Sequence, residues 1–198
     1  MERSEFETAR LAYREFLASP DRKFYEHRFA GPRREVDFCI CDSSMYGPLE
    51  LLWLHARYGL LMFALALPWS WPKVFAYRLM GARIGRRVYI SQRVYLDPLY
   101  PQLLSVGDDV LIGFGAQIFF HEITQRAYRV GRVTLGDGCI IGAGSMLRPG
   151  ITVGQDAQVC GMTAVAHDVP EKATVFGVPA RLIEPGTPAV PDSPEDRP

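Results

Sequence analysis

Aliphatic residues recur at every sixth position along much of the chain, beginning at Ile84. The series comprises Ile84, Ile90 and Leu96, then Val106, Ile112 and Ile118, then Leu135, Ile141, Leu147, Val153, Val159 and Val165. Glycine often occupies the next position, and a second set of small or β-branched residues lies four positions after each aliphatic residue. Neither the 3.6-residue period of a helix nor the alternation of a strand gives a period of six.

Short straight sides joined by corners do give this period. Each side points one aliphatic residue inward, and three sides close one turn of a triangular prism whose coils stack on a shared core. The expected corners carry residues that tolerate a left-handed backbone, namely Asp109, Gly115, Gly138, Gly144, Gly150, Asp156 and Asp168. A buried Ile or Val contributes roughly 1.5–3 kcal/mol, so a series of this length can hold the stack together. The pattern predicts a mainly β protein, a parallel β-helix of about four coils.

The six-residue spacing fails twice, and each failure predicts a loop. Leu96 and Val106 are ten residues apart, and Ile118 and Leu135 are seventeen apart. An extra residue inside a side would turn the core face outward, so the surplus should leave the prism. We expect loops at "DPLYPQ" and at "HEITQRAYRVG", the second of which begins with His121.

Residues 1–82 lack the repeat and predict a helical N-terminal extension. Ser4 and Glu7 have capping-box spacing and could start a helix that runs through Leu17. Further helices are expected from about Leu49 to Leu67 and from about Lys73 to Met80, and the segment 33–48 is ambiguous, with one short strand as an interpretation. The β-helix should occupy residues 83–184, and the proline-rich residues 185–198 predict a disordered tail.

The most apolar stretch, Tyr58 to Pro72, has two interpretations. Fifteen helical residues reach only about 22 Å, against about 30 Å for a hydrocarbon core, and Pro68 and Pro72 interrupt the helix. The stretch could be a helix buried against the protein or another subunit. Alternatively, residues 49–72 could lie on a membrane surface, with the three tryptophans near the headgroups, as a peripheral contact at the inner membrane face.

Composition narrows the functional classes. The 22 acidic and 22 basic side chains balance, so there is no basic excess for nucleic acid. Four cysteines without a CxxC pair indicate neither a disulfide framework nor a zinc knuckle. The first ten residues are charged and lack the apolar region of a signal peptide, which favours the cytoplasm.

The hexads, the histidine of the second loop and the ending "AVAHDVPEKATVFGVPARLI" together resemble a known family. They are similar to the left-handed β-helix (hexapeptide-repeat) acyltransferases, and most closely to bacterial O-acetyltransferases of the sugar and xenobiotic type. The likeness covers about residues 81–184. It implies a homotrimer with acetyl-CoA in a groove between adjacent prisms, a small-molecule hydroxyl or amine acceptor, direct attack without an acyl-enzyme, and no metal.

The resemblance also implies roles for particular residues. His121 would be the general base, worth typically ~10²–10⁴ in rate, although an isolated loop histidine often has no role. Glu122 could orient its imidazole or be an ordinary solvated carboxylate. Asp97, in "YLDP", and Gln92 stand where relatives contact the acceptor, and Asp97 could equally be a turn residue before Pro98.

The expected cofactor residues are Gly142, Ala143, Gly161, His167 and Arg181. The first three stand where the family's backbone lines the pantetheine groove, and Arg181 could meet a CoA phosphate or be a plain surface charge. The chain departs from the family at Gln92, where some sugar acetyltransferases have asparagine, at Ile140, where sugar-acetylating relatives often have tryptophan, and at His167, usually lysine. The departures at Gln92 and Ile140 point away from a simple sugar as acceptor.

Two other functions fit the same prism. A γ-type carbonic anhydrase needs three zinc-binding histidines, whereas the repeat region holds only His121 and His167. A non-catalytic or membrane-docked scaffold would account for the departures from the family, but it has no need of both His121 and Arg181.

Overall fold

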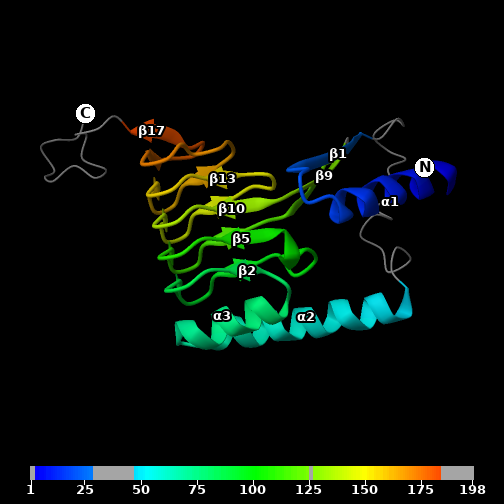
Figure 1. The fold of residues 1–198 in the computed structure, drawn as a ribbon, viewed down its shortest axis with the longest axis horizontal. Coiled ribbons are helices and arrows are strands. Elements are labelled where there is room, and N and C mark those ends of the chain that lie inside the picture. The colour runs from blue at the N-terminus through cyan, green and yellow to red at the C-terminus, as the bar shows by residue number, and fades with distance from the viewer. Residues whose placement is uncertain (1–2, 29–46, 125–126, 184–198) are drawn as a thin grey trace, which may run out of the picture.

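The computed structural model describes residues 3–28, 47–124 and 127–183, and its centre is a stack of triangular coils (Figure 1). The first sheet contains β2 (Arg83–Ile84), β5 (Leu104–Val106), β10 (Val133–Leu135) and β13 (Thr152–Val153). The second contains β3 (Tyr89–Ile90), β6 (Leu111–Ile112), β11 (Ile140–Ile141), β14 (Gln158–Val159) and β16 (Thr174–Phe176). The third contains β4 (Tyr95–Leu96), β7 (Gln117–Ile118), β12 (Met146–Leu147) and β15 (Ala164–Val165). These strands pair in parallel, and β17 (Arg181–Ile183) turns back antiparallel on β16.

The aliphatic series sets the register of all three sheets. Ile84 pairs with Val106, which pairs with Leu135 in the next coil, and the other two sides repeat this alignment. Every member of the series is buried, with at most 9% of its surface exposed. The prediction of a β-helix of about four coils with an N-terminal helical extension is confirmed.

Most residues expected at the corners have the predicted left-handed backbone conformation. Of the seven turn residues, six have positive φ, namely Asp109, Gly115, Gly138, Gly144, Gly150 and Asp156. Asp168 is the exception. Its side chain instead accepts the Thr152 backbone N–H at 2.8 Å and pairs with Lys23 at 2.6 Å. A corner can therefore be closed by a carboxylate as well as by a left-handed residue.

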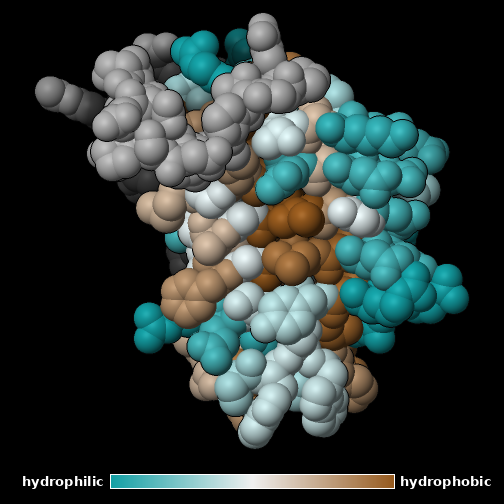
Figure 2. Space-filling model, turned by 90° about the vertical axis from the view of Figure 1, so that its left-hand side faces the viewer, coloured by the Kyte–Doolittle hydropathy of each residue, from teal (hydrophilic) through white to brown (hydrophobic). Residues whose placement is uncertain are grey.

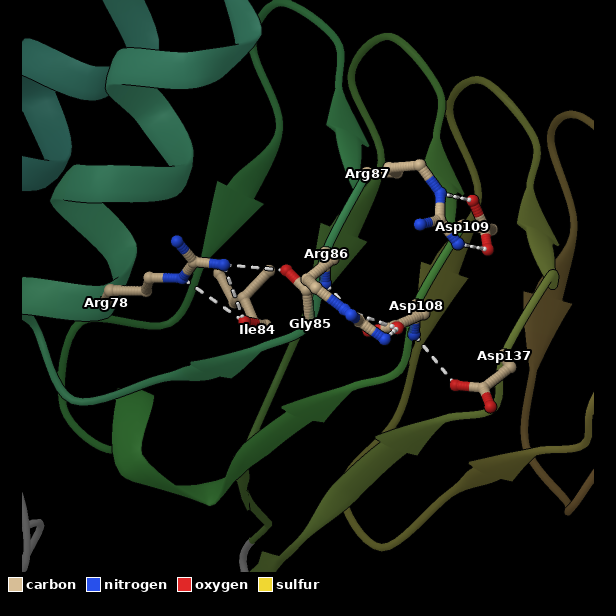
Figure 3. A network of polar contacts seen from close by, with 8 residues as sticks. All are labelled: Arg78, Ile84, Gly85, Arg86, Arg87, Asp108, Asp109 and Asp137. Carbon is tan, nitrogen blue, oxygen red and sulfur yellow. Dashed lines mark hydrogen bonds and ion pairs between the residues drawn. The ribbon is translucent and has the colours of Figure 1, made fainter.

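Charged side chains join successive coils at the corner between the first and second sides (Figure 3). Arg86 pairs with Asp108 of the next coil at 2.8 Å, and Arg87 pairs with Asp109 at 2.5 Å. Asp137 of the third coil accepts the Asp108 backbone N–H at 2.8 Å. The Arg86 backbone N–H, and then its guanidinium, lower the pKa of Asp108. This exposed ladder fixes the register of one corner across three coils.

The glycines that follow the aliphatic positions have a packing role. A Cβ added at Gly142 would lie 2.4 Å from the backbone N of Gly161, and one at Gly113 would lie 2.6 Å from that of Ala143. Real Cβ atoms do not approach backbone so closely, so a side chain at either position would push two coils apart.

Replacing Gly142 with alanine should therefore lower the free energy of unfolding by about 1–3 kcal/mol. The matched control is Gly59→Ala in α2, where nothing lies within 4 Å of the new Cβ. There the better helix propensity of alanine should raise stability by up to about 1 kcal/mol. Urea unfolding followed by circular dichroism measures both, and a neutral Gly142→Ala would contradict the close stacking.

The two expected loops leave the prism at neighbouring places. The first contains a short 3-10 helix, Pro101–Leu103. The second forms a hairpin of β8 (His121–Ile123) and β9 (Ala127–Gly131). In addition, β1 (Phe24–Arg28) pairs antiparallel with β9, which makes a small three-stranded sheet beside the prism (Figure 1). The sequence had not indicated this strand, and the interpreted strand in 33–48 falls mainly outside the described residues.

The extension contains the three expected helices, α1 (Arg3–Ala18), α2 (Pro48–Ala66) and α3 (Ser70–Leu79). The predicted start of the third helix at Lys73 was three residues late. α1 lies beside β1, whereas α2 and α3 lie across the end of the stack next to the first coil (Figure 1). By length and composition alone, α2 could cross a membrane, and only 11% of it is buried inside the structure.

Polar side chains of α3 pair with the exposed edges of the first coil. Arg78 donates to the Ile84 and Gly85 carbonyls, and Tyr77 donates to the Val94 carbonyl at 2.7 Å. On the second side, the Ser70 hydroxyl accepts the Ile90 N–H and the Lys73 ammonium donates to the Ser91 carbonyl at 2.6 Å. Because unpaired strand edges are a liability, α3 protects one edge on each side of the prism.

Candidate active site

His121 lies where the third side of the second coil opens into the hairpin. Ile118 is buried in the core and Phe120 is fully buried, whereas the His121 side chain keeps 22% of its surface exposed. Phe120 anchors the backbone immediately before the imidazole. The ring therefore stands on a rigid support and still reaches solvent.

Asp97, which lies in the preceding coil, contacts this imidazole. Its backbone N–H donates to the Ile118 carbonyl, and its carboxylate is fully buried. Oδ2 lies 2.5 Å from His121 Nδ1, and the carboxylate also accepts the backbone N–H groups of Leu99, at 3.0 Å, and Phe120, at 3.2 Å. A carboxylate accepts hydrogen bonds only, so Nδ1 carries a proton, and in the neutral imidazole Nε2 then has the lone pair. This is the arrangement of a base held in its active tautomer.

Two tyrosines enclose the imidazole. The Tyr100 ring lies edge-on to it at 5.7 Å between centroids, and the Tyr128 ring lies at 6.3 Å. Their hydroxyl oxygens are 2.6 Å apart, and both side chains are buried. The imidazole is thus fixed by one carboxylate and two rings, a degree of preorganisation that a loop histidine without a role does not need.

Glu122 does not contact the imidazole. Its carboxylate pairs with Arg148 at 2.5 Å and lies 4.0 Å from Arg129. Neighbouring residues of a strand point to opposite faces, so Glu122 is directed away from His121. The orienting role suggested for Glu122 is wrong in this structure, and Asp97, expected at the acceptor, makes that contact. Both loops open at the same corner, one coil apart, and this spacing was the signal in the sequence that could have identified the pair.

Several expected cofactor and acceptor residues lie at the corner between the second and third sides. Backbone hydrogen bonds link this corner from coil to coil: Gly115 N–H to the Gln92 carbonyl, Gly144 to Phe114, and Met162 to Ala143. Gln92, Ala143 and Gly161 are exposed there. Gln92 therefore groups with the expected cofactor glycines and not with Asp97. The third side of each coil separates this corner from His121 within one chain.

His167 and Arg181 lie nearer the last coil. His167 follows β15 and is exposed. Arg181 pairs in register with Phe176 in the β17 hairpin and is also exposed. Neither side chain contacts His121, so both remain predictions for the cofactor.

A cavity of about 210 Å³ lies between α1, α2 and the first loop. Its walls include Trp53, Arg57, Tyr100 and Gln102. Arg57 Nε and Gln102 Oε1 are buried there without a hydrogen-bond partner, and burial lowers the pKa of Arg57. Tyr100 separates this cavity from the imidazole. Sequence patterns did not indicate it, because its walls come from segments that are distant in the chain.

The described ranges contain two cysteines, and neither forms a disulfide. Burial raises the pKa of Cys139 to about 12, so its thiol stays protonated, and Cys160 is also free. In the part of the chain that the structure describes, no group of three or more His, Cys, Asp or Glu side chains is arranged to hold a metal ion.

Comparison with known proteins identifies the family. Residues 132–161 match the model described as the hexapeptide repeat of succinyl-transferase. "Putative acetyltransferase YvoF" of Bacillus subtilis is 31% identical over 140 residues, which cover 70% of this chain and 81% of that protein. The chain belongs to the hexapeptide-repeat acetyltransferase family. The resemblance inferred from the hexads and the His121 loop is therefore confirmed, and the scaffold alternative is not favoured.

Solved structures share the fold of this hexapeptide-repeat acetyltransferase. The acetyltransferase VCA0836 from Vibrio cholerae O1 biovar eltor, complexed with acetyl coenzyme A, superposes with a TM-score of 0.57 at 20% identity, covering 69% of this chain and 88% of that chain. A maltose O-acetyltransferase from Clostridium difficile 630 gives a TM-score of 0.51 at 19% identity, with coverage of 69% and 88%.

Proposed function

We propose that this acetyltransferase moves an acetyl group from acetyl-CoA to a hydroxyl or amine of a small-molecule acceptor, with His121 as general base. The observation that carries the proposal is the 2.5 Å contact between Asp97 Oδ2 and His121 Nδ1. The use of acetyl-CoA is supported by the family and by the acetyl-CoA in the VCA0836 complex.

The reaction needs one proton transfer in each direction. Nε2 of His121 takes the acceptor proton as the acceptor oxygen or nitrogen forms a bond to the thioester carbonyl carbon. The tetrahedral intermediate then collapses, the carbon–sulfur bond breaks, and the imidazolium returns the proton to the departing CoA sulfur. The Asp97 carboxylate holds the ring through Nδ1 and stabilises the imidazolium between these steps, so it is a positioning residue.

A homotrimer would complete the site. Within one chain the third side separates the glycine corner from His121, so a neighbouring chain would have to bring its own corner to the histidine. An apolar stripe on the second side suits such a contact: Tyr89, Leu111 and Ile140 align in register and are 52%, 41% and 39% exposed. On the face that Figure 2 shows, a band of hydrophobic side chains (brown) runs beside hydrophilic ones (teal).

The direct test incubates the purified chain with acetyl-CoA and a panel of hydroxyl and amine acceptors, and measures CoA release with a thiol-reactive chromogen. Calorimetry with acetyl-CoA and light scattering report binding and mass separately. We expect acceptor-dependent release by a trimer. A chain that binds no acetyl-CoA and releases no CoA with any acceptor would overturn the proposal.

A further inference from the structure

Large apolar side chains are exposed along the whole length of α2 and α3. These helices lie across the end of the coil stack (Figure 1), and we call their outward surface the end face. The large apolar side chains that these helices and the turn between them expose are Leu49, Leu52, Trp53, Tyr58, Met62, Phe63, Trp69, Trp71, Phe75 and Leu79, which are 42–81% exposed. Trp53 also borders the cavity beside α1. Monomeric soluble proteins rarely expose a continuous apolar patch of this extent, so the end face is expected to have a partner.

Most polar side chains of the two helices are turned toward the protein, and His55 of α2 is an exposed exception. In α3, Ser70, Lys73 and Tyr77 turn toward the first coil, and burial lowers the pKa of Lys73. In α2, Glu50 and Arg57 line the cavity toward α1, and Glu50 pairs with Arg14. The opposite side of α2 carries Leu52, Ala56, Gly59 and Phe63, spaced three or four residues apart, together with the exposed His55.

This arrangement reverses the usual amphipathic pattern. A surface helix normally packs its apolar stripe on the core and gives its polar face to water. Here only Leu61 and Ala64 of α2 are fully buried. The medium against the end face must therefore be less polar than water.

The composition of the end face favours a lipid surface. All three tryptophans of the chain, Trp53, Trp69 and Trp71, lie in this segment, and tryptophan is enriched at the level of lipid headgroups. By length and hydropathy α2 is also apolar enough for a lipid environment, and only 11% of it is buried inside the structure. We propose that the end face docks on a lipid bilayer, with α2 lying in the plane of the interface.

The fold opposes a spanning position for α2. Leu61 and Ala64 are fully buried, and α3 begins at Ser70, only four residues after α2 ends at Ala66. The α3 side chains Lys73 and Tyr77 are hydrogen-bonded to the first coil. A spanning α2 would have to leave these contacts, whereas a helix lying flat keeps them and buries only its outward side.

Intrinsic tryptophan fluorescence reports on this docking, because all three tryptophans of the chain lie within residues 48–79. The full chain is titrated with vesicles of phosphatidylcholine alone and with vesicles that contain phosphatidylglycerol. We expect a blue shift, quenching by brominated lipids, and co-sedimentation with both kinds of vesicle, because the end face is apolar. No shift and no co-sedimentation with either vesicle would overturn the proposal.

A matched pair of variants tests the surface itself. Leu52 and Leu11 are both 68% exposed, but Leu11 lies on α1, outside the end face. Leu52→Glu combined with Phe63→Glu should weaken vesicle binding at least about tenfold, and Leu11→Glu should not. Circular dichroism confirms folding. Unchanged vesicle binding by the double variant would overturn the bilayer as the occupant. A fall in the oligomeric mass of the double variant would also overturn it, because the end face would then contact another copy of the chain.

Discussion

His121→Ala should lower kcat for acceptor-dependent CoA release by about 10²–10⁴. The variant lacks the group that takes the acceptor proton, and nothing else at this position offers a lone pair held by a buried carboxylate. Because the loss falls on the transition state, kcat and kcat/KM should fall together. Acetyl-CoA affinity should stay near that of the wild type. Steady-state CoA release measures the first effect, and calorimetry measures the second.

Glu122→Gln is the control for this experiment. Glu122 is the adjacent carboxylate, but it pairs with Arg148 and is partly exposed. Its removal should change kcat by less than about threefold, as expected for a partly solvated ion pair. An unchanged rate in His121→Ala with intact oligomer mass would remove the general-base assignment. A large loss in Glu122→Gln alone would return the orienting role to Glu122.

The prism was predictable because its pattern is local and repeated. Each aliphatic position, such as Ile112 or Ile141, must be buried for a coil to stack, so the core requirement appears directly in the spacing. The loop positions follow from the same rule, since surplus residues cannot stay within a side. His121 was noticed in the sequence because it begins such a loop.

Long-range contacts were not predictable in the same way. β1 pairs with β9, far later in the chain, and its five residues carry no strong strand pattern. The orientation of α3 could not be predicted either, because a polar residue such as Lys73 is normally expected to face solvent. Its burial makes sense only once the open strand edges of the first coil are seen.

The catalytic dyad illustrates the same limit. Sequence proximity pointed to Glu122 as the partner of His121, whereas stacking brings Asp97 to it from the preceding coil. In a β-helix, residues one coil apart are neighbours and residues adjacent in a strand face apart. Pairing candidates by coil position is therefore the better rule for this fold.

Asp97→Asn should lower kcat by about 10²–10⁴, through the tautomer of His121. If the amide oxygen replaces Oδ2, it can still accept from Nδ1 and from the Phe120 N–H, but the amide NH₂ then faces the Leu99 N–H. If the amide is flipped, its NH₂ donates to Nδ1 and the imidazole proton moves to Nε2. The first arrangement leaves two donors opposed, and the second removes the base.

A double variant separates this positioning role from a loop-stabilising one. If Asp97 acts through the imidazole, the rate of Asp97→Asn combined with His121→Ala should be no lower than that of His121→Ala alone. Nitrogen-15 NMR of the imidazole should report protonated Nδ1 in the wild type and an altered tautomer in Asp97→Asn. Strictly additive losses, with an unchanged tautomer, would assign Asp97 only to holding the first loop. Non-additive losses would place the proton of His121 under the control of a carboxylate one coil away.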